Sequence, residues 1–146
     1  MKVISSSPDA TDEIGFKIGK KLRAGNIVRL YGDLGAGKTT LVKGIARAMG
    51  IDRKDITSAS FTIIAEYPGR PPFFHIDLYR LSGGTDLDGI GIWDCVGPHS
   101  VSVIEWAERA EDELPEDSLK ITMKDMGDDV REITIEGKNE EDWDNL

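Results

Sequence analysis

The stretch that decides the fold reads Gly32-Asp33-Leu34-Gly35-Ala36-Gly37-Lys38-Thr39. It fits the phosphate-binding pattern G-x-x-x-x-G-K-[ST], in which backbone N–H groups surround phosphate oxygens and the lysine reaches the outer phosphates. Glycines let the backbone curl without Cβ clashes, and the helix that follows adds the positive end of its dipole. A plain glycine-rich turn with a surface lysine is the weaker alternative, because the pattern fixes four identities. We therefore expect this stretch to bind a nucleoside triphosphate.

The flanks of this stretch have the local structure that the pattern requires. Residues 26–31 are apolar enough for a strand. Leu41, Val42, Ile45, Ala46 and Met49 have helical spacing and predict that a helix follows the stretch and ends at Gly50. The Thr39 hydroxyl is placed to coordinate Mg²⁺, which prefers hard oxygen ligands and accompanies the triphosphate. The cofactors expected from the motif are a nucleoside triphosphate and Mg²⁺.

The size of the chain predicts a single domain over residues 1–146, because 146 residues bury a substantial core and no linker or repeat divides them. The start lacks the apolar run of a signal peptide, and no stretch approaches the ~20 apolar residues of a membrane span. We therefore expect a cytoplasmic protein with no membrane contact. The single cysteine, Cys95, cannot form an intrachain disulfide, and we expect it to be buried or structural.

The charge of the chain argues against tight RNA binding on its own. Its 27 acidic and 18 basic residues give a net charge of −9, whereas nucleic-acid affinity comes largely from Lys and Arg that neutralise phosphates. Several acidic residues lie close together near the end of the chain, and we expect a tail at about 137–146. A solvated tail is the usual meaning of such a run, and a contact with a basic partner is the alternative.

The remaining periodicities predict an α/β fold with a mixed sheet flanked by helices. An amphipathic helix through Ile14, Ile18 and Leu22, capped by Asp9 or Thr11, precedes the loop strand. We expect a hairpin from residues 61–67 and 73–78, a buried strand at 101–105, short helices at 87–93 and 107–113, and a second hairpin from 119–123 and 133–135 that closes the sheet edge.

Two acids are candidates to complete a triphosphate site, because such a site needs a carboxylate near Mg²⁺ and a group that orients the nucleophile. Asp77 and Glu105 each end an apolar strand, which is the Walker B arrangement. Either acid alone could instead cap a helix or pair with Arg80 or Arg109. The presence of both favours a functional role, and the sequence leaves open which of them contacts the metal first.

The absence of certain motifs indicates which nucleotide the chain binds and which reaction it favours. No Asn/Thr-Lys-x-Asp motif for guanine occurs, and the Asp86-Leu87-Asp88-Gly89 match to D-x-x-G follows no convincing strand, so adenine is favoured. Beyond Leu81 the chain contains only Arg109 and Arg131, which does not fit the arginine-rich lid of a small-molecule kinase. Hydrolysis by water is therefore favoured over transfer to an acceptor. The hydroxyl-rich loop 57–62 lies where P-loop proteins place a segment ordered by the γ-phosphate.

Four motifs in order resemble the TsaE (YjeE) family over roughly residues 11–108. They are the phosphate loop through Thr40, Thr57-Ser58 with Phe61-Thr62 and Glu66-Tyr67, His75-Ile76-Asp77-Leu78-Tyr79-Arg80-Leu81, and Ile104-Glu105-Trp106. The resemblance implies a P-loop ATPase, weak on its own, that acts with the TsaD and TsaB proteins in making N6-threonylcarbamoyladenosine in tRNA. Hydrolysis of ATP would drive or reset the synthase complex, and tRNA would be contacted only indirectly.

The resemblance also implies roles for individual residues. Thr11 would contact the adenine side, Thr40 would support the nucleotide, and Thr39 and Glu105 would hold Mg²⁺. Lys38, Asp77 and Glu105 would be the catalytic residues, with Asp77, Tyr79 and Arg80 in a switch and partner-contact segment. The phosphates would be bound by Lys38 and by the loop amides of Asp33, Leu34, Gly35, Ala36 and Gly37.

Two departures and two alternatives accompany this hypothesis. Ala59 and Ala107 replace prolines of the family pattern, and without the ring at Ala59 the backbone of that loop is less restricted. Trp106 could stack on a ligand, but a tryptophan directly after a strand is more often a core or interface anchor. The alternatives to a partner-dependent ATPase are a small-molecule kinase and a nucleotide-sensing subunit without useful turnover.

Overall fold

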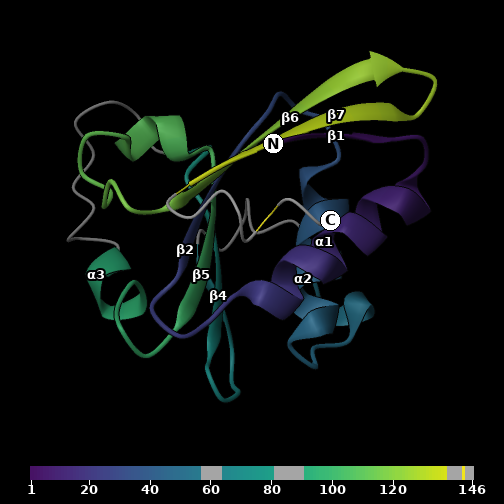
Figure 1. Ribbon diagram of the computed structural model, residues 1–146. Helices are drawn as coiled ribbons and strands as arrows, with labels where there is room; N and C mark the ends of the chain where they lie inside the picture. Colours follow the sequence, from purple (N-terminus) through teal and green to yellow (C-terminus); the bar gives the residue numbers. More distant parts are fainter. Residues whose placement is uncertain (57–63, 81–90, 138–142, 144–146) are drawn as a thin grey trace.

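A mixed β-sheet runs through the centre of the molecule. The computed structural model describes residues 1–56, 64–80, 91–137 and 143. Its seven described strands lie in the order β1-β7-β6-β2-β5-β4-β3 (Figure 1). The strands are β1 Lys2–Ser5, β2 Ile27–Tyr31, β3 Ile64–Tyr67, β4 Phe73–Asp77, β5 Val101–Glu105, β6 Leu119–Gly127 and β7 Val130–Glu136. The helices are α1 Pro8–Lys21, α2 Lys38–Ala48, α3 Ile92–Cys95, and the short 3₁₀ helices η1 Arg53–Asp55 and η4 Ala107–Ala110.

Strand β2, which leads into the phosphate-binding stretch, is the middle strand of this order. It pairs in parallel with β5 on one side and with β6 on the other, and β5 pairs in parallel with β4. Parallel strands end at the same edge of a sheet, where ligands of α/β proteins collect. The carboxyl ends of β2, β4 and β5 therefore meet at the edge where the phosphate-binding stretch begins.

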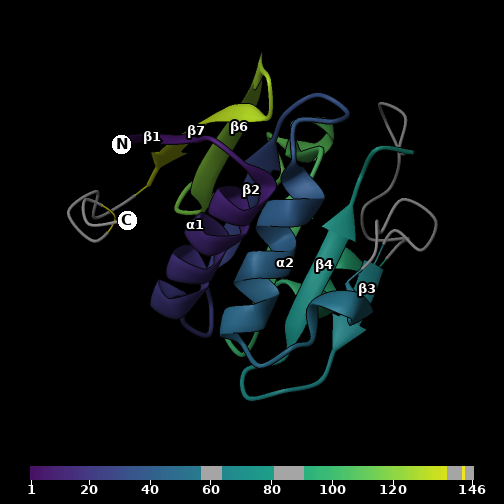
Figure 2. The same ribbon diagram turned by 90° about the vertical axis from the view of Figure 1, so that its right-hand side faces the viewer.

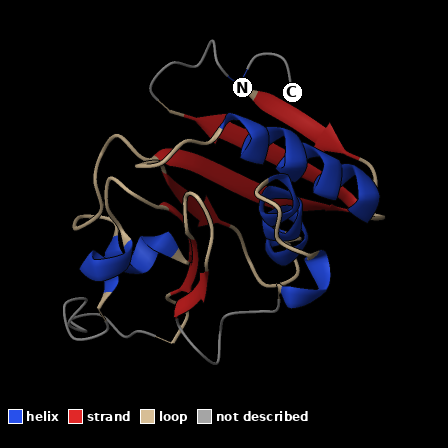
Figure 3. Cartoon of the chain, turned by 90° about the horizontal axis from the view of Figure 1, so that it is seen from below, coloured by secondary structure: helices blue, strands red, loops and turns tan. Residues whose placement is uncertain are grey.

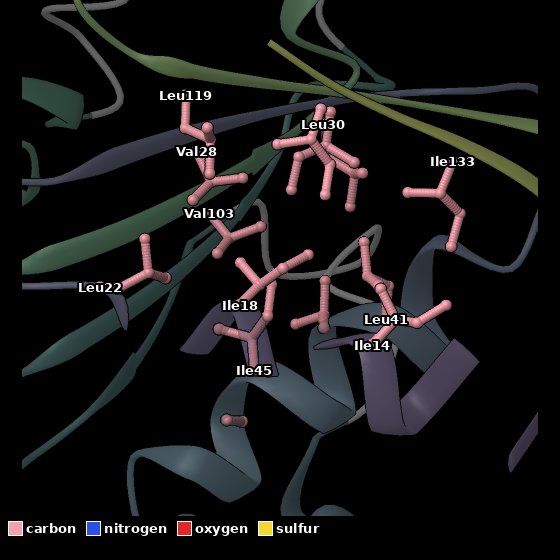
Figure 4. Packing of buried hydrophobic residues seen from close by; sticks show 14 of the residues in the cluster. Ile14, Ile18, Leu22, Val28, Leu30, Leu41, Ile45, Val103, Leu119 and Ile133 are labelled. Carbon is pink, nitrogen blue, oxygen red and sulfur yellow. The ribbon is translucent and has the colours of Figure 1, made fainter. Parts of the chain in front are cut away.

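The sheet separates two hydrophobic cores. Helices α1 and α2 cover one face, as Figure 2 and Figure 3 show from two directions, and they bury Ile18, Leu41 and Ile45 against Val28 and Leu30 of β2 (Figure 4). On the other face, α3 and η4 bury a second cluster. Its members are Phe74, Ile76, Leu78, Ile92, Cys95, Ile104, Ala107, Ala110 and Leu114. The prediction of an α/β fold with helices flanking a mixed sheet is confirmed.

Helices α1 and α2 touch backbone to backbone. A Cβ added at Gly15 would lie 2.3 Å from the carbonyl oxygen of Leu41, and one added at Gly44 would lie 2.1 Å from that of Asp12. Only glycine permits this approach. An ion pair from Arg47 to Asp12 of 2.9 Å links the same two helices. The helix that follows the phosphate-binding stretch is thus tightly fixed to its neighbour.

The predicted cap of the first helix was wrong. The cap is Ser7, whose side chain accepts from the Ala10 N–H at 3.1 Å, and the helix begins at Pro8. Asp9 lies in the first turn, where its charge suits the helix dipole. Thr11 lies inside the helix, and its hydroxyl bonds to the Ser5 hydroxyl. The cap is Ser7 because proline is favoured at the first helical position, and Pro8 at that position places the cap one residue before it.

The predicted position of the second hairpin was also wrong. Strands β6 and β7 do form a hairpin, and its turn is formed by Asp128 and Asp129, both with positive φ. The hairpin does not close the sheet, however, because β1 pairs antiparallel with β7 and takes the edge. Strand β1 has only four residues and its outward side chains are exposed, so its pattern was too short to detect.

The other expected elements agree within a few residues. The hairpin of β3 and β4 is present, although residues 61–63 lie outside the described part. The first short helix is α3, later than expected, and residues 87–90 are not described. The second is reduced to the 3₁₀ helix η4. Cys95 is buried, as expected, and its burial raises the pKa of the thiol. Within the described residues, no helix has the length and apolar character needed to cross a bilayer.

Candidate functional site

The phosphate-binding stretch forms a loop between the end of β2 and the start of α2. Gly37 precedes α2 in the left-handed conformation with φ +94, and a Cβ there would crowd the side chains of Met123 and Arg131. At the other end, a Cβ on Gly32 would lie 2.8 Å from the carbonyl oxygen of Met123. The loop therefore rests on β6 and can be built only with glycine at these points.

Lys38 folds back over this loop. Its Nζ donates to the carbonyl oxygen of Gly32 at 2.6 Å and lies 3.9 Å from the centre of the Trp106 ring. Burial lowers the pKa of Lys38, while the carboxylates of Glu105 and Glu108 oppose that change. A desolvated ammonium group interacts strongly with anions, because little water screens it. To reach a phosphate, Lys38 must exchange its bond to Gly32 for the new one.

Both acids predicted from the sequence lie beside the loop. Asp77 and Glu105 are paired in the register of β4 and β5, and Leu30 of β2 is opposite Glu105. Only 5% of Asp77 and 3% of Glu105 is exposed. Burial raises the pKa of Asp77, opposed by a hydrogen bond of 2.8 Å from the Tyr79 N–H to its carboxylate. The structure thus brings Asp77 and Glu105 near Lys38, and their predicted roles in catalysis and metal binding stay a prediction.

The donor set at the loop fits a magnesium ion that a bound triphosphate brings with it. Thr39, the second residue of α2, supplies a hydroxyl, and Glu105 and Asp77 supply carboxylate oxygens. Mg²⁺ is usually held by one or two carboxylates, waters and the phosphates themselves. In the described part of the chain, no group of three or more His, Cys, Asp or Glu side chains is arranged to hold a metal by itself.

The remaining predicted contact residues lie in three places. Asp33, Leu34 and Gly35 are exposed at the loop tip, and Ala36 is buried beneath it. Gly37 and Thr40 are half-buried at the start of α2 and within its first turn. Thr11 is separate from these, in α1, with 2% of its surface exposed and its hydroxyl 2.7 Å from that of Ser5. Its predicted contact with adenine stays a prediction, as do the nucleotide contacts of the loop. The predicted γ-phosphate loop at 57–62 lies outside the described residues.

Trp106 shields the lysine on the other side. It follows Glu105 directly and has φ +56, which is uncommon for a bulky residue. Its ring packs against the second core and lies 4.9 Å from the ring of Tyr79. The anchor role expected for Trp106 therefore agrees with the structure, and the same ring also contacts Lys38.

Two further residues at the site received no role in the sequence analysis. His75 bonds through Nε2 to Glu105 at 2.5 Å, and Arg131 donates to the carbonyl oxygen of Gly35 at 3.2 Å. The alternation of β4 could have indicated His75, because it lies two residues before Asp77 and so on the same face. Nothing in the sequence near Arg131 points to a loop 96 residues earlier.

A cavity of about 640 Å³ lies away from these residues. Its walls come from the end of α1, the start of β2, and residues 117–119, with Gly137 and Trp143. It contains neither the phosphate loop nor either acid. The candidate catalytic residues therefore lie at the carboxyl ends of the strands, apart from this cavity.

A strand, a glycine loop and a helix with this spacing, flanked by acids on adjacent parallel strands, define a P-loop nucleotide-binding protein. The model of the family described as "Threonylcarbamoyl adenosine biosynthesis protein TsaE" matches residues 5–133. The chain belongs to the TsaE family, which takes part in tRNA threonylcarbamoyladenosine biosynthesis.

Individual relatives agree with this assignment. The chain is 43% identical over 135 residues to the TsaE protein of Treponema pallidum, covering 92% of this chain and 99% of the relative. It is 40% identical over 130 residues to that of Bacillus subtilis, covering 88% and 80%. Among solved structures, the crystal structure of Bacillus subtilis YdiB superposes with a TM-score of 0.75 at 38% identity, covering 97% of this chain and 87% of the other.

Proposed function

We propose that this TsaE-family chain is an ATPase that is weak alone and acts with TsaD and TsaB in tRNA threonylcarbamoyladenosine formation. The observation that carries the proposal is the convergence of Lys38, Asp77 and Glu105 at the phosphate loop. A buried cation facing two buried carboxylates is arranged to bind Mg²⁺ and a polyphosphate together. The comparisons support the tRNA-modification pathway, and the reaction and partners are our inference.

In the proposed reaction, each residue of the site has a separate role. Loop amides and the start of α2 donate to the phosphate oxygens, and Lys38 moves from the Gly32 carbonyl to the outer phosphates. Thr39 and Glu105 would supply oxygen ligands for the metal, and Asp77 would orient the attacking water. Magnesium bound there would neutralise charge that develops on the transferred phosphoryl group. No residue acts as a covalent nucleophile in this scheme.

The nucleotide and the indirect role of tRNA rest on the sequence. The absence of a guanine-reading motif favours ATP, and Thr11 would lie on the adenine side of it. A net charge of −9 favours leaving tRNA contact to the other proteins of the complex. We place this action in the cytoplasm, and we treat residues 1–146 as one ATPase domain with an acidic tail at about 137–146. Trp143 of that segment is buried against the first core.

The test begins with binding. Calorimetry with MgATP should detect binding to the wild-type chain, and Lys38→Ala should weaken it by about tenfold or more. Lys43→Ala changes a lysine of the same helix that lies outside the loop and should leave binding unchanged. If the wild type shows no heat with MgATP, alone or with its partners, the proposal is wrong.

The second part of the test is reconstitution of tRNA modification with TsaD and TsaB. ATP should stimulate modification, Lys38→Ala should abolish the stimulation, and phosphate release should be slow without the partners. Equal stimulation by a non-hydrolysable ATP analogue would favour a nucleotide-sensing subunit. ATP consumption that rises with a metabolite and yields its phosphorylated form would favour a kinase. Either result would overturn the ATPase assignment.

A further inference from the structure

Arg131 of β7 reaches across the sheet to the outside of the phosphate loop. Its Nη2 donates to the carbonyl oxygen of Gly35 at 3.2 Å, and its Nη1 donates to the Asp125 carboxylate of β6 at 2.8 Å. The guanidinium group therefore bridges the β6–β7 hairpin and the loop. Its side chain is 17% exposed, whereas that of Asp125 is 54% exposed, so the arginine is the more enclosed of the two.

The contact is made at the part of the loop that needs an unusual backbone. Gly35 and Gly37 have φ of +83 and +94. A Cβ on Gly37 would lie 3.5 Å from Nε and 3.9 Å from Cδ of Arg131, so the arginine side chain also packs beside Gly37. The side chain thus spans the loop from Gly35 to Gly37, the segment whose amides the motif assigns to phosphate binding.

The direction of the hydrogen bond has a consequence for those amides. A peptide unit points its carbonyl and its N–H in opposite directions. When Arg131 holds the Gly35 carbonyl toward the hairpin, the N–H of Ala36 in the same peptide unit points away from the hairpin, and it donates to the Asp33 carbonyl at 3.1 Å, which closes a turn of the loop. A loop that is already restricted to few conformations loses less conformational freedom when a ligand arrives, which increases affinity.

We propose that Arg131 is a positioning residue for nucleotide binding: it clamps the Gly35 carbonyl and preorganises the phosphate loop, with Asp125 fixing the guanidinium. This inference rests on the proposed nucleotide-binding function and adds a residue from the far hairpin to it. Arg131 acts through the loop backbone, so its loss affects every ligand that uses the loop amides.

Binding measurements test the clamp with four variants. Arg131→Gln should weaken MgADP and MgATP by the same factor, about tenfold, because both ligands carry the phosphates that the loop amides hold. Arg131→Lys should be intermediate, because one ammonium cannot bridge Asp125 and Gly35 with the same geometry as the guanidinium fork. Asp125→Asn should cause a smaller loss. Lys124→Gln, a charge change next to Asp125 on the same strand, is the control and should bind as the wild type.

Two readouts distinguish a clamp from a general role in stability. In steady-state hydrolysis, Arg131→Gln should raise KM about tenfold and leave kcat unchanged. In the nucleotide-free protein, hydrogen exchange of the amides at residues 33–37 should become about tenfold faster, while the amides of β2 and β5 keep their protection.

The outcomes separate this inference from the proposed function. If wild type binds MgATP and Arg131→Gln binds it equally well with unchanged loop exchange, the clamp is wrong and the ATPase proposal stands. Full recovery by Arg131→Lys would also overturn the clamp, because it would show that only charge matters. If wild type binds no nucleotide, the proposed function fails, and loop exchange in the free protein still decides whether Arg131 holds the loop.

Discussion

His75 and Glu105 share a buried hydrogen bond of 2.5 Å between Nε2 and a carboxylate oxygen. His75 is completely buried, and its Nδ1 has no hydrogen-bond partner among the described residues. The His75 ring therefore fixes the Glu105 carboxylate, which lies at the edge of the sheet near Lys38. In the proposed function Glu105 is a ligand for Mg²⁺, and a carboxylate fixed in this way would need little rearrangement when the metal arrives.

Removal of the ring should destabilise the protein. We expect His75→Ala to lower the free energy of unfolding by about 1–3 kcal/mol, because the buried Glu105 carboxylate loses its donor. His75→Gln should recover part of the loss, since its amide also donates. Urea unfolding in the presence of a chelator gives the comparison. His99, which is exposed, provides the control: His99→Ala should change stability by less than about 0.5 kcal/mol. Equal stability of His75→Ala and wild type would show that the bond contributes nothing.

Asp77→Asn should stabilise the metal-free protein in a pH-dependent way. Burial raises the pKa of Asp77, so the folded state holds the proton more tightly than the unfolded state. The wild type therefore loses stability as pH rises from the ordinary Asp pKa through the raised one. The amide has no charge to desolvate and can still accept from the Tyr79 N–H.

Unfolding curves with chelator at several pH values measure this effect. The stability difference between Asp77→Asn and wild type should be smallest below about pH 4, where both states are protonated, and largest near neutral pH. A difference that does not change with pH would contradict a raised pKa. The stabilised variant should hydrolyse ATP poorly, because active sites commonly keep charged groups that lower the stability of the fold but are needed for activity.

The contact between α1 and α2 should not tolerate a methyl group. Alanine favours a helix interior over glycine by about 1 kcal/mol, whereas overpacking a core usually reduces stability by about 1–3 kcal/mol. At Gly44 the added Cβ would meet the Asp12 carbonyl at 2.1 Å, so the clash should dominate and Gly44→Ala should lower the melting temperature. Gly97→Ala adds a Cβ with no neighbour within 4 Å and should have little effect. If Gly44→Ala were more stable than wild type, the close approach of the helices would be wrong.

Chelation of magnesium should expose the role of Thr39. We expect EDTA to weaken ATP binding by the wild type about tenfold or more, because the loop and metal share the phosphates. Thr39→Val keeps the shape of the side chain but lacks the hydroxyl, so its ATP affinity should respond much less to EDTA. Thr122→Val, on β6, should respond as the wild type does. Calorimetric titrations with and without the chelator measure this effect. If EDTA weakened ATP binding by Thr39→Val as much as by the wild type, Thr39 would not be a ligand of the metal.

The sequence predicted those parts of the site that local patterns define. The loop spacing and the apolar runs that end in Asp77 and Glu105 were sufficient to place both acids at one sheet edge. Contacts between distant segments were not predictable in this way. Arg131 meets Gly35 only because β7 folds back beside β6, and β6 is placed next to β2 by a pairing that no local pattern specifies. Strand β1 was missed because its four residues, of which two are exposed, carry too little periodicity.

The central position of β2 also bears on how the chain is synthesised. Its partner β5 ends at Glu105 and its other partner β6 begins only at Leu119, so β2 keeps one unpaired edge until most of the protein has left the ribosome. The seat of the glycine loop on Met123 and Arg131 is completed later still. A nascent or truncated chain that stops before β7 would thus have the whole signature motif and the Met123 contact at Gly32, but not the Arg131 contacts at Gly35 and Gly37. The loop would gain its last support only after most of the chain has been synthesised.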